Sequence, residues 1–191
     1  MQRGVRARAE DLIAGLDYHR PMLKFEGYRL GENDEVIEID TAEQHRVAAT
    51  MMAQQTRHSI DIVSRDLDPS IYDTVEFVEA TRRLVLSGQR PRVRIIVFNP
   101  SLIVHRGHRL VDAALQLTTF YDLRKAGEEH KHFNGSLFIA DTTGYIHRFS
   151  SDRYEGKLNF CDKRESHLYL DEFEEMWSKA APDVNMRRLS L

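Results

Sequence analysis

The sequence predicts an α/β fold, with a mixed β-sheet and helices on both of its faces. Short β-branched runs alternate with segments of helical periodicity from residue 35 to about residue 118. The run VRIIVF at 93–98 is apolar almost throughout, which is typical of a central strand covered on both sides. Two later apolar runs flank the turn sequence DTTG and predict a β-hairpin. Alternation followed by a hairpin favours a sheet with both parallel and antiparallel strands.

The individual strands are predicted from period-two alternation or from short apolar runs bounded by turn residues. EVIEI alternates, whereas SIDIV and VRIIVF are buried runs, and Asn99-Pro100 ends the second of these. The predicted strands lie at 35–39, 59–63, 93–98, 120–124, 136–140, 145–149 and 156–160.

The helices are predicted from apolar stripes and their caps. Asp40 or Thr41 can cap a first helix that runs to residue 55. A second stripe between 77 and 85 ends at Gly88, because glycine readily adopts the left-handed conformation at a helix end. Two more helices are expected, one around 108–118 and one at the C-terminal end that buries Leu170, Phe173 and Trp177.

Length and composition indicate one domain. The chain has 191 residues, of which 41% are hydrophobic, enough for a core without disulfides or metals. We expect a body at 35–181, an N-terminal extension at 1–34 that packs on it, and a C-terminal tail at 182–191. A formal net charge of -3 disfavours a uniformly basic nucleic-acid-binding protein, so any anion site is expected to be local. One cysteine, no signal-peptide pattern and no apolar run of membrane length predict a cytoplasmic protein without a membrane partner.

The stretch HKHFNGSLFIADTTGYIHR at 130–148 carries a family resemblance. Members of the phospholipase D superfamily have H-x-K-x-x-x-x-D on a strand and the loop before it, then a turn glycine, a second strand and G-S-x-N. With the aspartate placed on Asp141, the histidine position holds Asn134 and the lysine position holds Ser136. HRFS at 147–150 stands in place of G-S-x-N. The chain thus resembles a degenerate member of this superfamily.

The resemblance extends over roughly residues 36 to 180 and implies a single phospholipase D-like domain. Three stretches occur in the order expected for the first half of that fold. They are SRDLDP after the second predicted strand, then VRIIVF, then HRGHRL. The chain is particularly similar to small uncharacterised bacterial domains with a degenerate phospholipase D-like body.

The resemblance also implies a chemistry that the substitutions remove. In this family one histidine attacks phosphorus, a second protonates the leaving oxygen, and paired lysines stabilise the phosphoryl charge. Asn134 cannot act as the nucleophile, and the neutral hydroxyl of Ser136 cannot replace an ammonium group. Asp141 also has a purely structural interpretation, as a turn residue whose carboxylate accepts backbone N–H groups.

Two alternatives involve the histidines before the hairpin. A shifted loop could bring His130 or His132 to the vacated position, with Lys131 as phosphate clamp, and activity would then require a homodimer because the chain has one motif. A metal site from these histidines with Asp141 and His147 matches no standard zinc spacing, so we expect no metal and no cofactor.

Anion binding is expected at the carboxyl ends of the strands, where open α/β sheets hold their ligands. Exposed cations in this region would contact phosphate groups, unless Arg106 and Arg109 pair with acidic neighbours instead. The candidate ligand-binding residues are Arg106, His108, His130, Lys131, His132 and Arg148.

We therefore expect a non-catalytic phospholipase D-like domain that binds an anionic ligand, either a phosphorylated molecule or nucleic acid, or a protein partner. The alternative is an active phosphodiesterase or nuclease that works as a homodimer through His130 or His132.

Overall fold

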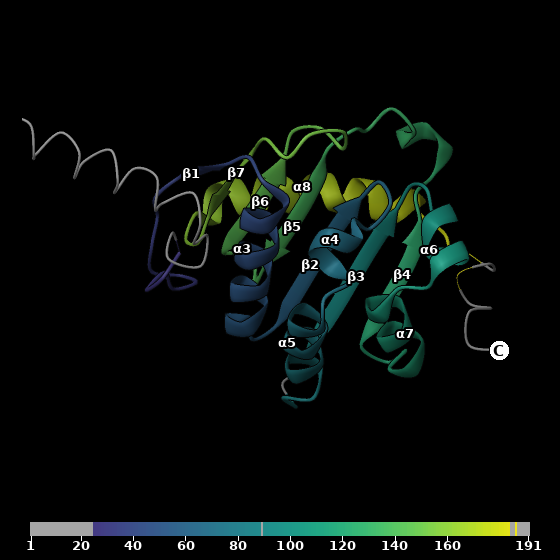
Figure 1. The fold of residues 1–191 in the computed structure, drawn as a ribbon, viewed down its shortest axis with the longest axis horizontal. Coiled ribbons are helices and arrows are strands. Elements are labelled where there is room, and N and C mark those ends of the chain that lie inside the picture. The colour runs from purple at the N-terminus through teal and green to yellow at the C-terminus, as the bar shows by residue number, and fades with distance from the viewer. Residues whose placement is uncertain (1–24, 89, 184–185, 187–191) are drawn as a thin grey trace, which may run out of the picture.

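The computed structural model describes residues 25–88, 90–183 and 186. Within them a seven-stranded mixed sheet has the order β1-β7-β6-β5-β2-β3-β4 (Figure 1). Its strands are β1 (Ile37–Ile39), β2 (Ser59–Ser64), β3 (Arg92–Val97), β4 (Tyr121–Lys125), β5 (Ser136–Ala140), β6 (Gly144–Arg148) and β7 (Gly156–Asn159).

The sheet has a parallel half and an antiparallel half. β2, β3 and β4 run parallel, because a helical crossover returns the chain to the same end before each new strand. β5 pairs antiparallel with β2, and β6, β7 and β1 continue as antiparallel neighbours. The start of β5 and the end of β6 therefore lie at the carboxyl end of β2, whereas the turn between β5 and β6 lies at its amino end.

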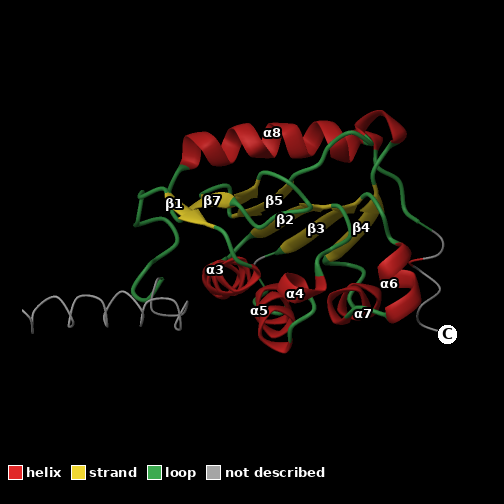
Figure 2. Cartoon of the chain, turned by 45° about the horizontal axis from the view of Figure 1, so that its top comes forward, coloured by secondary structure: helices red, strands yellow, loops and turns green. Residues whose placement is uncertain are grey.

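Helices cover both faces unequally (Figure 2). α3, α4, α5 and α7 cover one face and enclose the larger apolar core, whereas α8 alone covers the other face. The helices are α3 (Ala42–Gln55), α4 (Pro69–Tyr72), α5 (Val75–Val85), α6 (Ser101–Arg106), α7 (Arg109–Gln116) and α8 (Lys163–Lys179), with a short 3-10 helix, η2 (Glu128–His130).

The predicted fold class is confirmed, with differences in detail. Thr41, one of the two predicted caps, accepts the Gln44 N–H at the start of α3, and Gly88 has a φ of 80° after α5. The short helices α4 and α6 were not predicted, because four and six residues are too few to show periodicity. None of the helices in the described part of the chain combines the length and the apolar content needed to cross a bilayer.

The predicted N-terminal extension lies mostly outside the described residues. Its described part packs on the body: Phe25 is fully buried near Phe160, and the Leu30 N–H donates to Gln55 on α3. Most of the predicted tail at 182–191 also lies outside the described residues.

Candidate functional site

Asp141, the one motif position that matches the resemblance, is held by backbone groups. Its Oδ1 accepts the N–H groups of His58 at 2.7 Å and Ser59 at 2.9 Å, and its Oδ2 accepts that of Arg57 at 2.8 Å. The carboxylate thus ties the β5–β6 turn to the start of β2. This agrees with the structural interpretation of Asp141, and it places the residue at the opposite end of β5 from Asn134 and Ser136.

Asn134 and Ser136 lie at the carboxyl end of the sheet, where the family motif would hold its histidine and lysine. Asn134 donates to Ser150 Oγ at 3.1 Å and accepts from Ser151 Oγ, which ties it to the loop after β6. Ser136 is buried, pairs in register with Arg148, and hydrogen-bonds Tyr72. Burial raises the pKa of Tyr72 to about 12, so this phenol stays protonated at neutral pH.

Arg148 fills the space beside Ser136. Its guanidinium donates to Asp68 Oδ2 at 2.8 Å and to the carbonyl oxygens of Ser150, Ser151 and Arg153. The Arg148 and Asp68 side chains are only 8% and 12% exposed. Arg148 was a predicted ligand-binding residue. All three nitrogen atoms of its guanidinium donate hydrogen bonds inside the protein, and its charge is paired with that of Asp68.

Two aromatic side chains complete this buried network. The Tyr154 hydroxyl donates to Asp68 Oδ2 at 3.0 Å, and the Arg148 guanidinium stacks 4.2 Å from the Tyr154 ring centroid. His45 of α3 donates from Nε2 to the Tyr154 carbonyl at 2.7 Å. Burial lowers the pKa of His45 to about 4, so it is neutral at pH 7.

His108 is also committed to the fold. Its ring is 4% exposed, Nε2 donates to the Leu67 carbonyl at 3.0 Å, and Nδ1 accepts the Leu110 N–H at the start of α7. Burial lowers its pKa, which favours this neutral, internally bonded form. Arg106, by contrast, is exposed at the end of α6. The two residues therefore differ in exposure, although they are only two positions apart.

His130, Lys131 and His132 lie on the loop between β4 and β5. His130 ends η2 and is half-buried, whereas Lys131 and His132 are exposed. Phe133 fixes the loop by stacking on Phe98 at the end of β3, with ring centroids 5.5 Å apart and planes at 15°. This contact places the three residues at the carboxyl end of the sheet.

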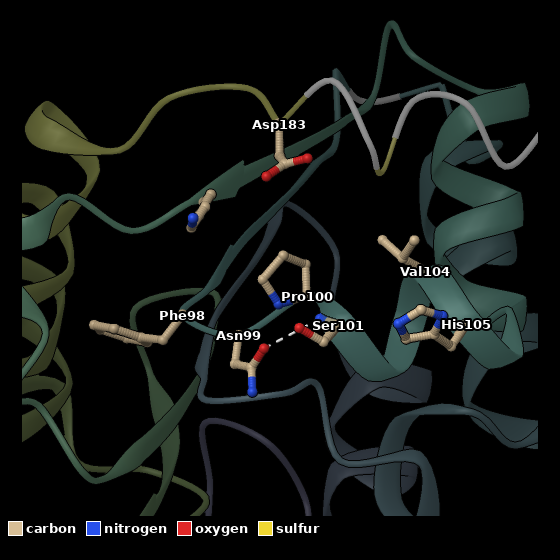
Figure 3. Close-up of a pocket in the computed structure, with 8 residues that line it drawn as sticks. Phe98, Asn99, Pro100, Ser101, Val104, His105 and Asp183 are labelled. Carbon is tan, nitrogen blue, oxygen red and sulfur yellow. Dashed lines mark hydrogen bonds between the residues drawn. The ribbon is translucent and has the colours of Figure 1, made fainter.

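A hollow of 300 Å³ lies at the same end, between the close of β3, α6 and the segment after α8 (Figure 3). Asn99 and Ser101 line this hollow, and Asn99 Oδ1 accepts the Ser101 N–H. Its other polar residues are His105, Lys125 and Asp183. Lys125 and Asp183 were not predicted from the sequence. Their segments are far apart in the chain, and the bridge between Lys125 and Ala181 brings them together.

The charge at the carboxyl end is balanced rather than basic. The segments at the ends of β2 to β6 are 64–74, 97–109, 125–136 and 148–155, and they hold seven arginines and lysines against seven acidic residues. Among the residues that the structure describes, no group of three or more histidine, cysteine or acidic side chains is placed to bind a metal ion.

Comparisons with known proteins agree with this architecture. The family model described as "Domain of unknown function (DUF7931)" matches residues 41–189. No curated protein matches the chain. Among solved structures, Nuc from Salmonella typhimurium, a phospholipase D family member, is 16% identical with a TM-score of 0.51 over 77% of this chain and 96% of its own. NucT from Helicobacter pylori is 13% identical with a TM-score of 0.56 over 78% of this chain and 99% of its own.

A further similar structure is TrmBL2, an archaeal chromatin protein with a novel mode of DNA binding. It is 17% identical with a TM-score of 0.59, and the match covers 93% of this chain but 64% of TrmBL2, so this chain spans less than two thirds of that protein. At such low identities the likeness concerns the fold, which is phospholipase D-like.

Proposed function

Since the chain belongs to the family described as "Domain of unknown function (DUF7931)", we propose from its own residues that it is a non-catalytic phospholipase D-like domain that binds a phosphorylated ligand. The observation that carries the proposal is the buried ion pair between Arg148 and Asp68 beside Ser136. This ion pair lies beside the position that holds a lysine in the family motif, because Arg148 pairs in register with Ser136.

The side chains of the motif support this proposal. A nucleophile must be within hydrogen-bond reach of its base and must attack through a lone pair, which the Asn134 amide nitrogen does not offer. Asn134 is also bonded to Ser150 and Ser151, and His45, the histidine of the buried network, donates to a backbone carbonyl. Neither arrangement supplies an activated nucleophile.

The exposed cations at the same end supply the ligand chemistry. Arg106 is exposed at the end of α6, and Lys131 and His132 are exposed on the loop after β4. His105 of α6 and Lys125 of β4 line the hollow at the same end of the sheet. Guanidinium and ammonium groups bind phosphate oxygens by charge-assisted hydrogen bonds. Because acidic residues balance the basic ones here, this end suits one small phosphate group better than a long polyanion.

The proposal is tested by mapping the amide signals of the ¹⁵N-labelled protein during titration with inorganic phosphate and with pyrophosphate. We expect saturable shifts of the amides in the loops at 98–106 and 125–134. The variant Arg106→Gln/Lys131→Gln should weaken pyrophosphate binding about tenfold or more, because two charge-assisted contacts are lost. The charge-matched variant Arg57→Gln/Arg92→Gln, altered at the opposite end of the sheet, should keep the wild-type pyrophosphate response in these two loops.

Two results would contradict the proposal. One is the absence of saturable shifts at millimolar pyrophosphate. The other is turnover of a phosphodiester that disappears in His130→Ala/His132→Ala, which would favour the homodimeric phosphodiesterase instead. A folded protein that binds neither phosphate probe but captures a defined protein through these loops would also replace the proposal with a protein-interaction role.

A further inference from the structure

The amino end of the parallel strands is strongly basic, in contrast to the carboxyl end. The matching segments at the ends of β2 to β6 are 56–59, 82–92, 117–121 and 140–144. They hold five arginines, Arg57, Arg82, Arg83, Arg90 and Arg92, against a single acidic residue, Asp141. In these segments the positive charge is thus concentrated at the end of the sheet opposite to Asn134 and Ser136.

The arginines of this end come together from separate segments. Arg57 precedes β2 and Arg92 begins β3, and the Arg92 N–H donates to the His58 carbonyl at 3.0 Å. Arg57 and Arg83 line one hollow of 260 Å³ between the ends of α3 and α5, together with Gln54 and Ser87. In Figure 1 these ends of α3 and α5 lie along the lower edge of the molecule, where β2 and β3 begin.

Four of the guanidinium groups are available to a ligand. Arg57, Arg83, Arg90 and Arg92 are exposed. Among the described residues, no ion pair and no hydrogen bond involves the guanidinium of Arg57, Arg90 or Arg92, and that of Arg83 donates only to the Glu79 carbonyl of its own helix at 3.4 Å. Asp141 does not pair with them through side chains, because its oxygens accept the backbone N–H groups of 57–59.

We propose that this basic end, formed by Arg57, Arg83, Arg90 and Arg92, binds the phosphodiester backbone of nucleic acid. Arginine forks match phosphate oxygens in pairs, and arginines spread over two segments can contact successive phosphates. Such contacts do not read base sequence, so binding is sequence-independent and weakens with salt. Leu86 is the one large apolar side chain of the described part of this end that is exposed, which is too little apolar surface for a membrane-binding face.

The test is the fluorescence anisotropy of a labelled duplex DNA and of a labelled single strand, titrated with the full chain at two salt concentrations. We expect Arg57→Gln/Arg92→Gln to lower the affinity for DNA at least tenfold and to reduce the slope of log affinity against log salt by about 2, the value for two lost phosphate contacts. The charge-matched Arg106→Gln/Lys131→Gln, altered at the carboxyl end, should keep wild-type affinity and slope.

The outcomes separate this inference from the proposed function. DNA binding that is unchanged in Arg57→Gln/Arg92→Gln, or that is lost only in Arg106→Gln/Lys131→Gln, would overturn the inference and leave pyrophosphate binding at the carboxyl end untouched. Binding to vesicles containing phosphatidylserine, without binding to DNA, would also overturn it. Thermal unfolding of both variants checks that a loss of binding is not a loss of fold.

Discussion

The guanidinium of Arg148 lies 2.8 Å from the carboxylate of Asp68, inside the protein and beside Ser136. The two residues are 80 positions apart in sequence, and their pairing joins the end of β6 to the start of α4. Two opposite charges that are almost fully removed from water depend on each other, because either one alone would be a buried unpaired charge. This pairing also balances the charge of Arg148 inside the protein.

The first prediction concerns this pair. Arg148→Met should lower the free energy of unfolding by about 3–5 kcal/mol, because it leaves the Asp68 carboxylate buried without its partner. The double variant Asp68→Asn/Arg148→Met should recover part of that loss. Urea unfolding measures both, with Arg153→Met, an exposed neighbour, as control. A loss below about 1 kcal/mol in Arg148→Met would show that the pair does not hold this end together.

The second prediction concerns Asp141. Asp141→Ala should destabilise the fold by about 2–4 kcal/mol, because three backbone N–H groups lose a charged acceptor. Asp141→Asn should cost less, since asparagine keeps one oxygen and tolerates the left-handed backbone at this position, where φ is 52°. Urea unfolding of both variants gives the comparison, and a loss below about 1 kcal/mol in Asp141→Ala would argue against the role of the carboxylate.

The third prediction follows from the low pKa of His45. Burial lowers this pKa to about 4 from its ordinary value of 6.5, so the unfolded chain takes up the proton more readily than the folded one. Above the unfolded pKa both states are neutral and no stability is lost. As the pH falls from 6.5 toward 4, the folded state loses stability, by about 2 kcal/mol at about pH 5.

Urea unfolding at neutral and mildly acidic pH checks this dependence, with His45→Gln as the comparison. The variant should lose less stability on acidification than the wild type. Some dependence should remain, because burial also lowers the pKa of His108 and of His147. The same acid-induced loss in both proteins would show that His45 does not titrate as described.

The fourth prediction concerns the attachment of α8. Arg94 pairs with the fully buried Asp61 at 2.6 Å and with Glu174 of α8 at 2.8 Å, and it stacks on Phe173. Arg94→Met should cost about 3–5 kcal/mol, because Asp61 is left buried and unpaired. Glu174→Gln should cost less than about 1 kcal/mol, because that side chain is 46% exposed. Similar losses in the two variants would contradict this assignment.

The sequence predicted the elements whose pattern is local. The apolar run of β3, the DTTG turn between β5 and β6 and the cap at Thr41 depend on neighbouring residues, and each is present in the structure. Strand ends shifted by one or two residues, as at β1 and β6, because pairing with a neighbour sets them.

The site was less predictable, because its contacts join distant segments. Arg148 and His108 were expected to contribute to anion binding. In the structure Arg148 pairs with Asp68, and His108, at the start of α7, hydrogen-bonds to the Leu67 carbonyl. Neither partner is visible in a local pattern. The basic amino end was missed for a related reason: Arg57, Arg83 and Arg92 are scattered along the chain, and only the parallel topology of β2 and β3 brings their segments to one end.

The central claim, that the motif hairpin is non-catalytic, is tested most directly by phosphodiester hydrolysis. Purified wild type and His130→Ala/His132→Ala would be compared on bis(p-nitrophenyl) phosphate and on labelled single- and double-stranded DNA, with an active phosphodiesterase as positive control. The Arg148–Asp68 pair and the Asn134 and Ser136 side chains predict no turnover above the buffer blank in either protein. Turnover that copurifies with the wild type and is lost in the double variant would contradict the account.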